Sequence, residues 1–171
     1  MVKTLGVEAG ELPDDALLRK YLHSGGYADC YFIDVGHAIS HAEYVEAFYT
    51  TFVFKLERLI LAWFASRPST DLQARELAAG TLDTFAAWKV EARAPDQLLL
   101  TDYLHRTRSW LMCVHSADGQ GTRLYFGSAV VHAVDRRTGE ARMGIVFRAL
   151  LGFHRLYSRI LLGAAAWRLA R

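Results

Sequence analysis

The closing segment of the chain, residues 147–171, constrains the fold more than any other stretch. It reads FRALLGFHRLYSRILLGAAAWRLAR and combines apolar residues with arginines. At about 100° per residue, Arg148, Arg155 and Arg159 fall on one narrow stripe of a helix. The opposite side carries apolar residues: Val146, Leu150, Phe153, Tyr157, Ile160, Leu161 and Ala164. This pattern predicts a long amphipathic helix whose apolar side is buried.

The same pattern fits other surroundings. A basic and apolar helix is also typical of a membrane surface, so a membrane-associated protein is an alternative. Helices that cover a protein core are much commoner, and we expect residues 147–171 to do this. The net charge of +2 is too small to indicate nucleic-acid binding, and no recognition motif accompanies the arginines. We therefore predict no nucleic-acid partner.

The composition predicts one cytoplasmic domain, residues 1–171. Hydrophobic residues make up 52% of the chain and charged residues 22%, as in globular domains. The first residues lack the apolar core of a signal peptide, and no stretch supplies the ~18 uncharged apolar residues of a membrane span. Cys30 and Cys113 are the only cysteines and form no CxxC pair. They predict two buried thiols, with no disulfide framework, metal site or cofactor.

Two short elements are predicted near the start. Pro13 and the acidic residues after it are typical of the first turn of a helix, here a short one that ends at Gly25. Residues 27–35, YADCYFIDV, are aromatic and β-branched and predict a strand.

Helices are expected next. Ser40 and Glu43 have the spacing of a capping box, and a helical pattern follows to about residue 66. The β-branched residues within 50–53 indicate a bend in it. Residues 72–80, LQARELAAG, predict a further turn or two of helix before the glycine.

From residue 81 onward, the spacing of apolar residues changes from the helical period to alternation with polar residues. Residues 84–94 predict a strand on which Trp88, Val90 and Ala92 share one face. Further strands are expected at 98–104, 106–116 and 122–134, separated by turn residues. Because the connections are short, antiparallel pairing is expected. The order of elements predicts an α+β helix-grip fold: a curved antiparallel sheet wrapped around the long C-terminal helix, with helices inserted after the first strand.

A family resemblance supports this arrangement. The motif FAAWKVEARAPDQLLL…RSWLMCV…DGQGTRLYFGSAVV, followed by a long helix, resembles the START-like superfamily, also called SRPBCC or polyketide-cyclase-like. The closing GFHRLYSRILLGAAA further resembles a bacterial subfamily of unknown function. The resemblance covers roughly residues 27–166. It implies a cavity between sheet and helix, and members variously bind lipids, sterols or aromatic products, cyclise polyketides or act as co-chaperones. It transfers no catalytic residue.

Aromatic and basic residues on the facing elements are the candidates for a cavity lining. They are Trp88, Arg108, Trp110, Phe126, Phe153, His154 and Tyr157. Aromatic side chains most often pack in the hydrophobic core without binding a ligand. A guanidinium that points away from the core is simply solvated. An inward Arg108 would instead clamp a carboxylate or phosphate.

The polar residues give no recognisable catalytic motif. His37 and His41 are spaced i, i+4, but no third metal ligand follows at a recognisable spacing. His105, His115 and His132 converge only if the strand register allows it. Ser109 and Ser128 lack both a nucleophile-elbow motif and a local base.

Two functions of different classes remain. The first is a carrier or sensor that binds a small apolar or amphipathic molecule between sheet and C-terminal helix. The second is a cyclase- or hydrolase-like enzyme that acts on a hydrophobic carbonyl compound in the same cavity. A weaker alternative is a membrane-associated protein or homodimer, which would expose residues such as Phe54 and Leu61.

Overall fold

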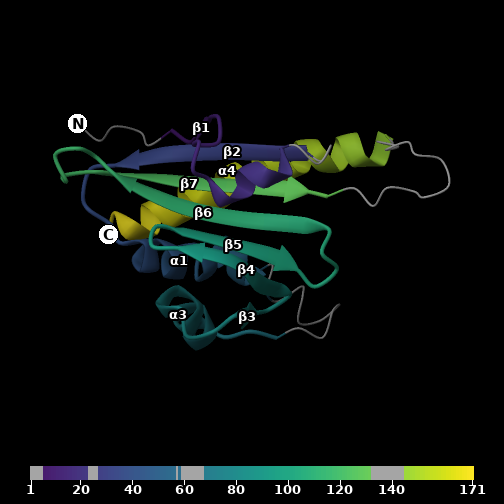
Figure 1. The fold of residues 1–171 in the computed structure, drawn as a ribbon, viewed down its shortest axis with the longest axis horizontal. Helices are drawn as coiled ribbons and strands as arrows, with labels where there is room; N and C mark the ends of the chain where they lie inside the picture. Colours follow the sequence, from purple (N-terminus) through teal and green to yellow (C-terminus); the bar gives the residue numbers. More distant parts are fainter. Residues whose placement is uncertain (1–5, 23–26, 57, 59–67, 132–144) are drawn as a thin grey trace.

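The chain folds as an α+β structure built on one seven-stranded, curved antiparallel sheet (Figure 1). A computed structural model describes residues 6–22, 27–56, 58, 68–131 and 145–171, and of residues 145–153 it describes the backbone. The strand order is β1-β2-β7-β6-β5-β4-β3. Among the described residues, no helix is both long and apolar enough to cross a bilayer.

The four central hairpin strands form a meander, as the short connections predict. The strands are β4 (Trp88–Ala94), β5 (Gln97–Asp102), β6 (Thr107–His115) and β7 (Thr122–Val130). The strand β2 (Tyr27–Val35) pairs with β7 along its whole length, and its bounds match the predicted strand. Two short edge strands were not predicted: β1 (Glu8–Ala9) beside β2, and β3 (Thr84–Phe85) beside β4.

A bulge in β4 corrects the predicted alternation. The pairing with β5 shifts register between Val90 and Ala92, so the strand does not keep one face throughout. Trp88 and Val90 pack with the core beneath the helices, whereas Ala92 packs on the opposite face. The expectation that these three share a face is wrong because one extra residue, Glu91, breaks the two-residue period.

Capping boxes fix the starts of two helices. Ser40 caps α1 (His41–Tyr49) with Glu43, as predicted, and Thr70 caps α3 (Asp71–Ala79) with Gln73. The α1 helix ends at Tyr49, with Thr50 as its C-cap, and helical structure resumes at residues 52–56, so the β-branched run does interrupt it. The predicted helix extends to about residue 66, but residues 59–67 lie outside the described part.

The helix α4 (Ile145–Leu169) packs against β2, β7 and α1 on one face of the sheet. Its fully buried residues include Ser158, Leu162, Ala165 and Ala166. This buried face includes Leu161, as predicted, but is shifted around the helix from the predicted side. Ile160, which was expected to be buried, is exposed instead. The shifted face buries three small side chains, Ser158, Ala165 and Ala166, together with Leu161 and Leu162, and small residues allow a helix to pack closely on its neighbours.

The opposite face of the sheet carries a second core. The 3-10 helix η1 (Leu17–Tyr21) covers it, later and shorter than the predicted helix near Pro13. Leu18 and Trp110 are both fully buried there, and the Trp110 indole donates a hydrogen bond of 2.9 Å to Gln97 Oε1. Gln97 Oε1 also accepts from the Leu17 backbone, which ties η1 to β5.

Gly127 is a tight point of this second core, and Gly127→Ala is expected to destabilise the fold. A Cβ at this position would lie 2.8 Å from Leu18 Cδ2 and 2.9 Å from both the Asp29 carbonyl oxygen and Trp110 Cε3. We expect a loss of about 1–3 kcal/mol in the free energy of unfolding, measured by urea denaturation. Gly36→Ala is the control, because no atom lies within 4 Å of its Cβ. Equal stabilities of the two variants would contradict this packing.

Candidate functional site

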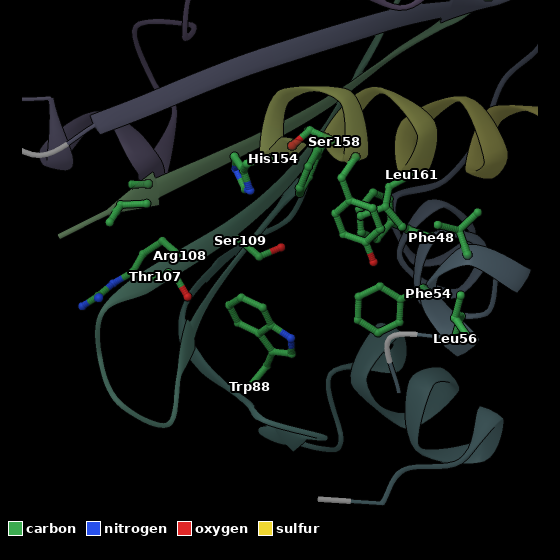
Figure 2. A pocket seen from close by; sticks show the side chains of 15 residues that line it. Phe48, Phe54, Leu56, Trp88, Thr107, Arg108, Ser109, His154, Ser158 and Leu161 are labelled. Carbon is green, nitrogen blue, oxygen red and sulfur yellow. The ribbon is translucent and has the colours of Figure 1, made fainter. Parts of the chain in front are cut away.

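A cavity of about 480 Å³ lies between the sheet and α4 (Figure 2). Residues from β4, β6, β7, α1, α4 and the segment at residues 53–56 line it. Its apolar wall includes Phe48, Phe54, Phe126 and Leu161. Phe48 and Phe126 lie with ring centroids 4.9 Å apart, so aromatic side chains fix the shape of this wall.

The structure brings together most of the predicted lining residues. Trp88, Phe126, His154 and Tyr157 line the cavity, and Arg108 borders it. Trp110 does not line it, because its side chain is buried on the other face of the sheet. The side chain of Phe153 lies outside the described part of the chain.

The guanidinium of Arg108 is held outside the cavity. Its Nε donates to Glu91 Oε2 at 2.8 Å and to the Tyr21 hydroxyl at 3.0 Å, and its Nη1 donates to the His105 carbonyl. Lys20 forms a second ion pair with Glu91, and together these cations hold the pKa of the Glu91 carboxyl below its ordinary value. Figure 2 shows the side chain pointing away from the cavity. The guanidinium therefore clamps no ligand group in the cavity, and it is held in an ion pair rather than merely solvated.

A chain of three polar side chains lies at one end of the cavity. Ser128 Oγ is 2.6 Å from Asp29 Oδ1 and 2.6 Å from His154 Nε2. Asp29 Oδ1 also accepts from the Ser128 backbone N–H at 3.1 Å, and Asp29 Oδ2 lies 3.7 Å from His154 Nε2. The carboxyl of Asp29 is largely buried, and the imidazole of His154 is about one third exposed.

The contacts fix the direction of the hydrogen bonds. A carboxylate only accepts, so the single hydroxyl proton of Ser128 is donated to Asp29. The Ser128 oxygen is then an acceptor, and His154 must present Nε2–H to it. When the imidazole is neutral, its Nδ1 is left as an acceptor. This order differs from a catalytic triad, in which the serine donates to the histidine.

Backbone register explains why these side chains meet. Asp29 pairs with Ser128 across β2 and β7, and Ser128 pairs with Ser109 across β7 and β6. The three therefore form one row on the face toward α4, and His154 reaches that row from the helix. Sequence reasoning found Ser109 and Ser128 but no base for them, and it missed Asp29. No local sequence signal joins them, because the strand register that pairs them is set by the whole sheet.

Two polar atoms of the lining have no hydrogen-bond partner in the described part of the chain. They are Ser158 Oγ, whose residue is fully buried, and the buried Trp88 Nε1. Ser158 projects from α4 and Trp88 from β4, so the two lie on different walls. An unpaired buried polar group costs about 1–3 kcal/mol, and protein atoms cover both of these, so a ligand would reach either one only after a small movement of its side chain.

The other histidines stay apart from the cavity. His37 Nε2 contacts the Leu169 carbonyl at 3.1 Å, and burial lowers the pKa of His41. His105 sits in the β5–β6 turn, and His115 contacts Thr122 near the end of β6. His132 lies outside the described part. Within the described residues, no three histidine, cysteine or acidic side chains are grouped as a metal site would require.

The two cysteines are buried free thiols, as predicted. Burial, together with the charge of Asp29, raises the pKa of Cys30 to about 12, and burial with Asp96 raises that of Cys113 to about 11. At pH 8 both thiols are therefore protonated and shielded.

We expect iodoacetamide at pH 8 to leave the folded protein unmodified, because the thiolate is the reactive form. In urea, two alkylated cysteines per chain are expected, counted by mass spectrometry. Rapid alkylation of either cysteine in the folded protein would show that its thiol is accessible and ionised.

Comparisons with protein-family models, with curated proteins and with solved structures give no match to this chain. The assignment of the candidate site is therefore based on the geometry of the residues described above.

Proposed function

We propose that this protein binds a small apolar or amphipathic molecule in the cavity between the sheet and α4, as a START-like protein of helix-grip fold. The order of elements and the sheet packed on a long C-terminal helix are compatible with that fold. A volume of about 480 Å³ is within the usual range of small-molecule sites, roughly 300–1,000 Å³.

The observation that carries the proposal is the contrast between an apolar wall and two unpaired polar atoms. Phe48, Phe126 and Leu161 offer apolar surface, while Ser158 Oγ and Trp88 Nε1 have no partner in the described part of the chain. A ligand with an apolar body would fit the wall, and a small movement of the Trp88 or Ser158 side chain would let a polar group of the ligand pair with the atom that is now covered. Trp88 Nε1 can only donate, so this group must include an acceptor such as a carbonyl or hydroxyl oxygen.

The fluorescent probe 1-aminoanthracene, with an apolar ring system and one amine, tests the cavity. We expect saturable binding to the wild type and a loss of about tenfold in affinity for Val53→Phe, because the added ring occupies cavity volume. Val114→Phe is the matched control, since Val114 is exposed on β6 and does not line the cavity.

Native mass spectrometry of protein purified from cells completes the test. A co-purified small molecule is expected in the wild type and lost from Val53→Phe. An empty mass, together with equal probe binding by the wild type and Val53→Phe, would refute the proposal.

One observation favours a second candidate, an enzyme acting on a hydrophobic carbonyl compound. The chain from Asp29 through Ser128 orients the imidazole of His154, which lines the cavity. In ester hydrolysis, Nδ1 of His154 would accept a proton from water as the water oxygen bonds to the carbonyl carbon, and would return that proton to the alcohol oxygen as the ester C–O bond breaks. Ser128 would position the histidine and would not act as nucleophile, because its proton is held by Asp29.

Hydrolysis of 4-nitrophenyl octanoate distinguishes the two functions. If the protein is such an enzyme, we expect the turnover rate to fall about 100-fold or more in His154→Gln. In Ser128→Ala the turnover rate should fall less, and its pH profile should shift. Equal rates for wild type and His154→Gln would exclude this candidate for ester substrates. An acyl group trapped on Ser128 would contradict the positioning role.

A further inference from the structure

The outer face of α4 carries an unpartnered apolar stripe. Leu156, Ile160 and Trp167 are respectively 58%, 46% and 57% exposed, although each is a large hydrophobic residue. At about 100° per residue they fall within roughly 40° of one another on the helix. The rotation of the buried face toward Ser158 and Ala165 leaves this stripe in solvent.

Arginines border the stripe on both sides. Arg155 and Arg159 lie along one edge, and Arg168 and Arg171 lie along the other. None of these four pairs with a carboxylate in the described part of the chain. Residues 154–171 contain four arginines and no aspartate or glutamate, so the described outer face of α4 is basic.

The remaining contacts of these arginines leave their charge available. Arg155 Nε donates to the Tyr27 hydroxyl, and Arg159 lies 5.5 Å from the Tyr31 ring centroid. Arg168 donates to the Thr50 carbonyl, which anchors the end of the helix. Each partner is neutral, so every guanidinium keeps its positive charge.

We propose that the outer face of α4 docks on an anionic lipid surface, with the helix lying in the plane of the interface. Apolar residues that include tryptophan, bordered by arginines, are typical of interfacial helices. The Arg171 guanidinium already lies 3.4 Å from the Trp167 ring centroid, where an aromatic ring and a cation would both meet lipid headgroups. Anionic headgroups supply the negative charge that this face lacks.

A second copy of the chain fits this face less well. In a two-fold dimer the same surface contacts itself, so the arginines of each copy would oppose those of the other. Docking on lipid also requires no unfolding, because the inner face, with Leu161, Leu162 and Ala166, stays packed on the sheet. The proposal is independent of what occupies the cavity.

Co-sedimentation of the full chain with vesicles tests the proposal. We expect binding to vesicles of phosphatidylglycerol and phosphatidylcholine in equal parts, and little binding to pure phosphatidylcholine. Binding should weaken as salt concentration rises, because salt screens the arginines. Trp167→Phe is expected to remove most of the blue shift of tryptophan fluorescence that accompanies binding.

Two sets of variants separate the apolar stripe from its charged borders. The combined substitution Leu156→Ser, Ile160→Ser and Trp167→Ser, and separately Arg159→Gln with Arg171→Gln, should each weaken vesicle binding at least about tenfold. The control combines Leu72→Ser with Arg75→Gln on α3, where both residues are exposed, and should bind as the wild type does. Circular dichroism verifies that each variant is folded.

Two results would overturn the proposal. One is equal binding to anionic and neutral vesicles, or no binding to either. The other is a concentration-dependent dimer in sedimentation velocity that the triple serine variant abolishes, because the stripe would then be an interface between copies.

Discussion

The structure depends on the close packing of α4 against β2 and β7. Ala165 and Ala166 are fully buried, and such small side chains allow a helix to pack closely on its neighbours, here α1, β2 and β7. Larger residues earlier in the helix, His154 and Tyr157, border open space instead. The C-terminal part of the helix is therefore buried in the core, and its earlier part forms one wall of the cavity. The same rotation that buries Ser158 exposes a basic and apolar outer face.

Local patterns predicted most of the elements. The β-branched and aromatic residues of β2 and the capping box at Ser40 are signals that neighbouring residues suffice to define. The rotation of α4 was not predictable in this way, because hydrophobicity favoured Ile160 over alanine as a buried residue. Close approach of helix and sheet, a tertiary effect, reversed that order. The bulge at Glu91 moved Ala92 to the other face for a similarly non-local reason.

The candidate site was predictable in part. Trp88, Phe126, His154 and Tyr157 were expected to line a cavity because they lie on the elements that face each other, and they do. Trp110 was expected there too. Because side chains alternate along a strand, however, Trp110 lies on the other face of the sheet from Ser109 and Leu111, in the second core. The polar chain from Asp29 to His154 joins side chains that are up to 125 residues apart (154 minus 29). Strand register brings Asp29 to Ser128, and the packing of α4 on the sheet adds His154; neither is written in local sequence.

The central claim is that apolar space is kept open between the sheet and α4 for a small molecule to enter. A crystal structure determined under xenon pressure measures this most directly, since xenon enters apolar cavities that water leaves empty. The account predicts a xenon atom among Phe48, Phe126 and Leu161, with the surrounding side chains unmoved. Xenon bound elsewhere in the crystal but absent from this cavity would contradict it.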